Sequence, residues 1–348
     1  MHCQLLIPGA LTRNPGLIDK LAALQLPALQ RLLAKGRADT QNWQGLDTWL
    51  LESFAVEQQQ DWPSAPFALL GDDLAPGEHC WAHADPVSLR ADRDRLVLAD
   101  ATQLEIRIDE AHAIAQSIAA HFGEALRLHV AAPGRWYARI AAPPKGETVA
   151  LAGVVGRHLE AGRGAMGWHA LMNELQMLLH EHPVNNAREE RGEAPINGIW
   201  LWGAGNLAAA NSTFASIATT KPLAMGLGRQ AGINVRSLPA NAVQWMDATA
   251  APGVHVCVYE ALQDAEKRGD AAQWLDSLVA LERDWIAPCV GSLTDGHLGM
   301  LSIKLGDAQW LTSIEATRQD LRRFWRRKHP LAQTLAGSDV PEAKRSTG

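Results

Sequence analysis

The chain has 348 residues, of which 47% are hydrophobic and 20% charged, and its formal net charge is −6. This length allows one or two domains with a large core. The net negative charge argues against non-specific binding to nucleic acid, so we expect no nucleic-acid partner. The sequence shows neither a signal peptide nor an apolar segment long enough to cross a membrane, so we expect a cytoplasmic protein with no membrane partner.

The four cysteines are scattered along the chain, and no two of them form a CxxC pair. Such spacing predicts free thiols in a reducing compartment rather than a disulfide framework or a zinc site.

The N-terminal third begins with an apolar run, Gln4 to Ile7, that Pro8-Gly9 ends. This run predicts a buried first strand, and open α/β sheets bind ligands at the C-terminal ends of such strands. We expect helices over 21–33 and 43–56, and a loop rich in proline and glycine over 61–78.

Residues 80–145 predict a mixed module. Short alternating runs favour strands, and between them Asp109 is expected to cap a helix that ends at Gly123. We interpret this segment as an α+β module inserted into a larger fold.

The stretch from Trp168 to Asn206 is the most informative part of the chain. Apolar residues at helical spacing predict a helix that Pro183 ends. Asn186 is expected to cap a short second helix, and residues 196–202 to form a strand before a Gly-Ala-Gly turn.

Polar and aromatic side chains crowd these junctions and suggest a site for an anion or a polar ligand. The candidate ligand-binding residues are Trp168, Asn173, His180, Asn185, Arg188, Arg191, Asn197, Trp202, Gly203 and Gly205. The alternative interpretation is that these groups cap helix ends and satisfy loop backbone, as such residues often do. The Gly203-Ala-Gly205 turn matches a dinucleotide-binding pattern only loosely, because the acidic residue expected about twenty positions later is missing.

Beyond this stretch strands and helices alternate, with a last helix expected over 311–328. Alternation predicts an α/β fold with a mostly parallel central sheet that helices cover on both faces. We therefore expect a discontinuous core of residues 1–79 and 146–335, the inserted module at 80–145 and a flexible tail at 336–348.

The run HEHPVNNAREERGEAPINGIWLWGAG resembles the archaeal-type, cofactor-independent phosphoglycerate mutases of the alkaline phosphatase superfamily. Nearly the whole chain is also similar to the bacterial RpfE-type regulatory proteins. The matching pieces are LLIPGAL, LPALQRLLAKGRA, ADPVSLRADRDRLVLAD, WHALMNELQMLLHEHPVNNARE, PINGIWLWGAG and FWRR.

The resemblance to the mutases implies two divalent metals, a serine nucleophile and arginines that hold phosphate. It places a metal-binding aspartate after the first strand, where this chain has Pro8-Gly9. It places further ligands in a loop that corresponds to residues 263–270, and an Asp-His pair near the C-terminus. The remnants in this chain are Asp264, Asp270 and Asp307, the last of which alanine rather than histidine follows.

The preferred hypothesis is a catalytically degenerate, metal-free protein with a regulatory role, because loss of most ligands of two metal sites is hard to repair. It would bind a small phosphorylated or acidic metabolite or a protein partner, and an oligomer is possible. The alternative is a divergent phosphomutase or phosphatase that still uses two divalent metals such as manganese or zinc.

Overall fold

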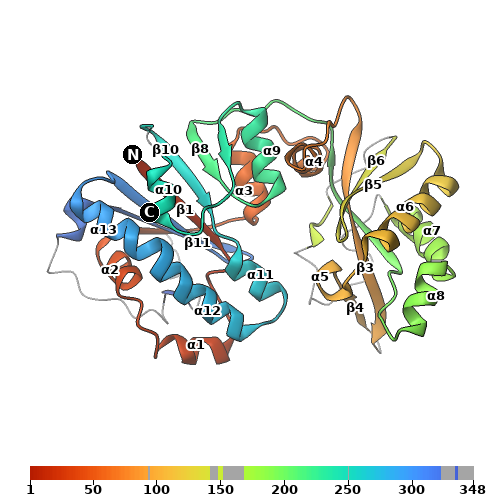
Figure 1. The fold of residues 1–348 in the computed structure, drawn as a ribbon, viewed down its shortest axis with the longest axis horizontal. Helices are drawn as coiled ribbons and strands as arrows, with labels where there is room; N and C mark the ends of the chain where they lie inside the picture. The colour runs from red at the N-terminus through yellow and green to blue at the C-terminus, as the bar shows by residue number, and fades with distance from the viewer. Residues whose placement is uncertain (93–94, 142–147, 152–167, 250, 323–333, 336–348) are drawn as a thin grey trace, which may run out of the picture. The chain divides into compact units, whose positions relative to one another are not determined.

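The computed structural model describes residues 1–92, 95–141, 148–151, 168–249, 251–322 and 334–335 (Figure 1). The expected tail at 336–348 lies outside the described residues. The chain forms two compact units, and each is built from separate segments. Unit 1 contains residues 1–49, 213–220 and 234–348, and unit 2 contains residues 50–212 and 221–233. These boundaries differ from the expected ones, because residues 50–79 and 168–212 belong with the segment 80–141.

Unit 1 is built on a seven-stranded sheet in which β1 is central. In sheet order its strands are β2 (Arg37–Asn42), β12 (Trp310–Thr317), β11 (Met300–Gly306), β1 (His2–Pro8), β10 (Val254–Val258), β8 (Phe214–Ala218) and β9 (Asn234–Arg236). Neighbouring strands from β11 to β9 are parallel, and β12 runs antiparallel to both of its neighbours, β11 and β2. The expected α/β fold with a mostly parallel sheet is confirmed.

The main core of unit 1 lies on one face of this sheet. Cys3, Leu5 and Ile7 alternate along β1 and are fully buried there. The helices of this unit are α1 (Pro15–Leu21), α2 (Pro27–Lys35), α10 (Ala242–Asp247), α11 (Ala261–Lys267), α12 (Ala271–Leu281), a π-helical turn (Glu282–Ile286), α13 (Ala287–Asp295) and α14 (Arg318–Leu321). Asp270 caps α12 by accepting the N–H of Gln273 at 2.9 Å.

The helix expected over 311–328 is wrong for its first half. Residues 310–317 form β12, whose buried Leu311, Ile314 and Ala316 contribute to the interior of the unit. The β-branched residues Thr312 and Ile314 fit a pleated strand better than a helix, and pairing with both β11 and β2 satisfies the backbone. Of the remainder, residues 318–321 form α14 and 323–328 lie outside the described residues.

Unit 2 contains a separate antiparallel sheet built around β3 (Cys80–Asp92). Its other strands are β4 (Arg95–Ala99), β5 (Leu126–Ala132), β6 (Arg135–Ile140) and β7 (Gly198–Gly205). Strand β7 pairs with β3 and is therefore part of this sheet rather than of the parallel sheet. The helices are α4 (Ser64–Gly71), α5 (Ala101–Leu104), α6 (Ile108–Phe122), α7 (His169–His180), α8 (Pro183–Glu190) and α9 (Pro222–Gln230). Between the two units the chain passes through α3 (Leu46–Ser53).

The prediction of a loop over 61–78 is wrong for its central part, because residues Ser64–Gly71 form α4. Almost every residue of α4 is buried, so it shows no amphipathic periodicity, and Pro66 lies in its first turn, where proline is tolerated. It packs closely on α9, since a Cβ at Gly226 would lie 1.8 Å from the carbonyl oxygen of Phe67. Among the described residues, no helix has both the length and the apolar character needed to cross a membrane.

Candidate functional site

The C-terminal end of β1 is the place where the resemblance expects a metal-binding aspartate. Gly9 occupies it with a φ of +72°, and a Cβ there would lie 2.6 Å from the backbone Cα of Gln263 in α11. The carbonyl oxygen of Gly9 accepts the indole N–H of Trp274 at 2.8 Å. Helices α11 and α12 therefore close over this turn and leave no space for a side chain.

The three carboxylates expected as metal remnants have other surroundings. Asp264 lies exposed in the first turn of α11, and Asp270 is the exposed N-cap of α12. Asp307 accepts the backbone N–H groups of Gln309 and Trp310, both at 2.6 Å, in the turn between β11 and β12.

These residues do not fit a pair of divalent metals. Two such ions need several carboxylate or imidazole ligands that converge on one place. Among the described residues, no group of three or more His, Cys, Asp or Glu side chains is arranged to hold a metal ion.

The residues singled out between 168 and 206 all lie in unit 2, and Asn185 is the clearest example of how they are used. It is 5% exposed, and its amide donates to the carbonyls of Leu179 and Ile196 at 2.7 and 2.9 Å. Its side-chain oxygen accepts the N–H of Ile196 at 2.8 Å. Asn185 thus joins the end of α7 to the segment that leads into β7, because all of its hydrogen-bonding groups face backbone.

Helix α8 begins earlier than the sequence suggested. His182, not Asn186, is its N-cap, and the Nδ1 atom of His182 accepts the N–H of Val184 at 3.2 Å. Pro183 then takes the first helical position, for which its fixed φ is suited. Asp109 likewise is not the cap of α6, because Arg107 is the N-cap and Glu110 accepts its N–H at 3.0 Å.

Arg188 is 1% exposed and lies at the centre of an ion-pair network. It donates to Glu110 in α6 at 2.7 Å and, through Nε, to the carbonyl of Ala194 at 2.8 Å. Arg191 bonds Glu110 at 2.6 Å and Glu193 at 2.9 Å, and Arg107 bonds the same two carboxylates.

Glu193 is the half-buried carboxylate of this network. The guanidinium groups of Arg191 and Arg107 lower the pKa of Glu193 to about 2, so it stays ionised and both ion pairs persist at neutral pH.

Asn197 and Trp202 hold β3 and β7 together. The side chain of Asn197 exchanges two hydrogen bonds with the backbone of Leu89, at 2.7 and 2.9 Å. Trp202 donates to Asp85 at 2.6 Å, and its ring stacks on His83 with a centroid distance of 4.0 Å.

Gly203 and Gly205, which were expected to form a ligand-binding turn, lie in the last part of β7, where the chain packs closely. The N–H of Gly203 donates to Thr148 at 2.9 Å, and a Cβ at Gly205 would lie 2.6 Å from Pro63. Both roles are structural and neither needs a phosphate.

The remaining candidates do not converge. Trp168 is buried in the core of unit 2, whereas Asn173 and His180 are exposed on α7. The structure thus brings Asn185, Arg188 and Arg191 together at α8, and it places the other seven elsewhere in the unit. That any of the ten binds a ligand stays a prediction.

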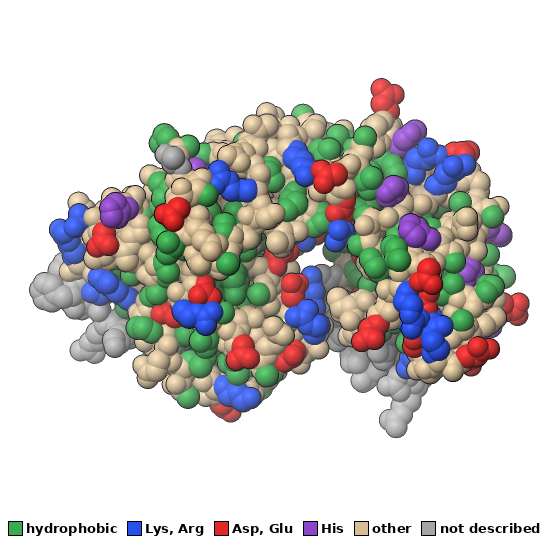
Figure 2. All heavy atoms as spheres, viewed as in Figure 1, with side chains coloured by type: hydrophobic (Ala, Val, Ile, Leu, Met, Phe, Trp, Pro, Cys, Tyr) green, Lys and Arg blue, Asp and Glu red, His purple; other side chains and the backbone are tan. Residues whose placement is uncertain are grey.

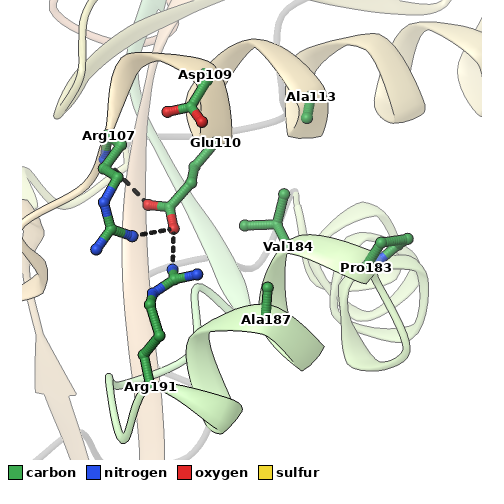
Figure 3. Close-up of a pocket in the computed structure, with 8 residues that line it drawn as sticks. All are labelled: Arg107, Asp109, Glu110, Ala113, Pro183, Val184, Ala187 and Arg191. Carbon is green, nitrogen blue, oxygen red and sulfur yellow. Dashed lines mark hydrogen bonds and ion pairs between the residues drawn. The ribbon is translucent and has the colours of Figure 1, made fainter.

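Helices α6 and α8 border an open pocket of about 580 Å³ (Figure 3). Its lining residues are Arg107, Asp109, Glu110, Ala113, Pro183, Val184, Ala187 and Arg191. In Figure 2, basic and acidic side chains lie next to one another over this part of unit 2. Sequence reasoning found Arg191 but missed Arg107 and Glu110. A Glu three residues after Arg107, in the first turn of α6, was the one available signal, as in a capping box.

Comparison with known proteins gives a consistent result. A probable 2,3-bisphosphoglycerate-independent phosphoglycerate mutase of Geobacter sulfurreducens is 30% identical over an alignment of 154 residues, and the match covers 40% of this chain and 38% of that protein. No family model matches the chain.

Two solved structures share the fold over nearly the full length. The cofactor-independent phosphoglycerate mutase of Thermoplasma acidophilum has a TM-score of 0.51 at 17% identity, covering 98% of this chain and 95% of its own. The PH0037 protein of Pyrococcus horikoshii has a TM-score of 0.57 at 14% identity, covering 96% and 92%. The chain therefore shares its fold with these two proteins, and less than half of it is similar in sequence to the Geobacter protein.

Proposed function

We propose that this protein is a catalytically degenerate relative of the phosphoglycerate mutases that has lost its metal centre and acts by binding. Its role is regulatory, as the similarity to the RpfE-type proteins suggests. Its ligand is a small acidic metabolite or a protein partner.

The observation that carries this proposal is the closed turn after β1. A metal-binding aspartate at position 9 would need α11 to move, because the Cβ position is 2.6 Å from backbone rather than from a flexible side chain. The exposed positions of Asp264 and Asp270 support the same conclusion.

Metal content tests the proposal directly. The full chain is dialysed against Mn²⁺ or Zn²⁺, freed of excess ion by gel filtration and analysed by mass spectrometry of the elements. We expect clearly substoichiometric metal and no hydrolysis of a phosphate monoester beyond the background rate.

The competing function is a divergent phosphomutase or phosphatase. It requires two ions per chain and their loss in an Asp264→Asn or Asp307→Asn variant. That result, or metal-dependent turnover, would overturn the proposal.

A further inference from the structure

The pocket between α6 and α8 combines an apolar lining with a positioned guanidinium group. Ala113 of α6 and Val184 and Ala187 of α8 are small side chains that leave an indentation between the two helices (Figure 3). An indentation of this kind accepts a branched alkyl group, because burial of apolar surface stabilises binding.

Arg191 is held at the edge of this indentation. Its Nε and Nη2 atoms donate to Glu193, both at 2.9 Å, and Nη2 also donates to Glu110 at 2.6 Å. Within the described part of the chain, its Nη1 atom has no hydrogen-bond partner. In Figure 3, the terminal nitrogen of Arg191 that carries no dashed line points to the side where Val184 and Ala187 lie. A fixed donor loses little conformational entropy on binding, so it is suited to receive an anion.

The charges around the pocket select the type of anion. Arg107 and Arg191 are balanced by Asp109 and Glu110, so the lining has no formal net charge. A phosphate dianion would bring two negative charges close to the carboxylates of Asp109 and Glu110. A single carboxylate meets the available donors with much less repulsion.

We propose that this pocket binds an aliphatic monocarboxylate, whose carboxylate group bonds Nη1 of Arg191 while its branched alkyl group contacts Ala113, Val184 and Ala187. The proposal rests on the binding role proposed above and names the ligand class. Such a group is found in a small free acid and in the C-terminal residue of a polypeptide.

Titration of the full chain followed by NMR tests this proposal. Isovalerate carries both features, isovaleramide lacks the charge, acetate lacks the branched group, and inorganic phosphate is the dianion. We expect saturable shifts of the Arg191 side-chain and Ala187 methyl signals with isovalerate, and affinities for the other three that are about tenfold weaker or less. N-acetylleucine, which imitates a polypeptide C-terminus, distinguishes the two sources: tighter binding than isovalerate assigns the site to a polypeptide, and weaker binding assigns it to a free acid.

Two variants provide the matched control. Ala187→Leu fills the indentation without touching the ion pairs and should weaken isovalerate binding about tenfold or more. Ala120→Leu adds the same atoms to an exposed position of α6 and should leave binding unchanged. The proposal is overturned if isovalerate gives no saturable shift, if phosphate binds more tightly, or if Ala187→Leu has no effect. These results are independent of metal content, so they separate failure of this pocket from failure of the proposed function.

Discussion

Arg188 in α8 and Glu110 in α6 form a buried ion pair at 2.7 Å, although the two residues are 78 positions apart in sequence. The guanidinium group of Arg188 also satisfies two backbone carbonyls, those of Ala194 and Leu104. This pair therefore joins α8 both to α6 and to the chain that precedes α6.

Replacing Arg188 by methionine should destabilise the protein by about 3–5 kcal/mol, because Glu110 would remain buried with fewer partners. The control is Arg127→Met, whose ion pair with Glu124 is exposed and should contribute about 0–1 kcal/mol. Urea unfolding followed by circular dichroism measures both. Equal costs for the two variants would contradict the central role of Arg188.

Gly9→Ala tests the closed turn after β1. Gly9 and Gly269 both have positive φ angles, +72° and +67°, but only Gly9 has backbone where a Cβ would lie. Gly9→Ala should therefore cost roughly 1–3 kcal/mol more than Gly269→Ala, which carries the conformational cost alone. Thermal unfolding of the two variants measures the difference. Similar stabilities would mean that α11 yields easily and that an aspartate can be accommodated.

Glu282 predicts a pH dependence of stability. Burial raises the pKa of its carboxyl group, although the N–H groups of Ala28 and Leu29, at 2.6 and 3.0 Å, oppose the shift. Because the pKa is raised, the folded chain binds this proton more tightly than the unfolded chain does. Protonation of Glu282 therefore stabilises the fold fully below the ordinary pKa of 4.5, and this contribution to the free energy of unfolding is lost as the pH rises through the pKa of the folded state. The free energy of unfolding of the wild type relative to Glu282→Gln should therefore fall with rising pH above about 4.5.

Asp284 is the control of opposite sign for this measurement. Its hydrogen bond with Arg283 lowers the pKa of Asp284, so its stabilisation is present at neutral pH and is lost on acidification. The free energy of unfolding of the wild type relative to Asp284→Asn should therefore rise with pH. The rise should be weak, because Arg283 of this ion pair is exposed. If the relative free energy of unfolding changed with pH in the same direction for both variants, the direction of one of the two pKa shifts would be contradicted.

Asn185→Asp separates a structural role from a ligand-binding one. The substitution turns a donor that faces the carbonyls of Leu179 and Ile196 into an acceptor, which should cost about 3 kcal/mol or more. Asn173→Asp makes the same change on an exposed site and should be nearly neutral. If unfolding measurements give equal stabilities for Asn185→Asp and Asn173→Asp, the hydrogen bonds of Asn185 to the backbone are not its main role.

Local chemistry made much of the fold predictable. The apolar run of β1 and the end of α7 shortly before Pro183 each depend on a few neighbouring residues. Helix α4 was missed because nearly all of its residues are buried and no periodic pattern marks it. The strand β12 was missed because its apolar positions, such as Leu311 and Ile314, also suit one face of a helix.

The site was predictable only in part, because pairings between distant segments decide it. Nothing near Arg188 in sequence indicates that Glu110 is its partner, and nothing near β7 indicates that it pairs with β3. Asn185, Asn197 and Trp202 were predicted to bind a ligand, and the hydrogen bonds that the structure shows for them are made within the protein. Polar residues at helix junctions serve the backbone as readily as a ligand.

The distribution of the cysteines allows the transient opening of each unit to be followed separately. All four thiols are buried, with Cys80 in unit 2 and Cys3, Cys257 and Cys289 in unit 1. A short pulse of an alkylating reagent, followed by peptide mass spectrometry, therefore records the transient opening of either unit through its own native thiols, and no engineered label is required.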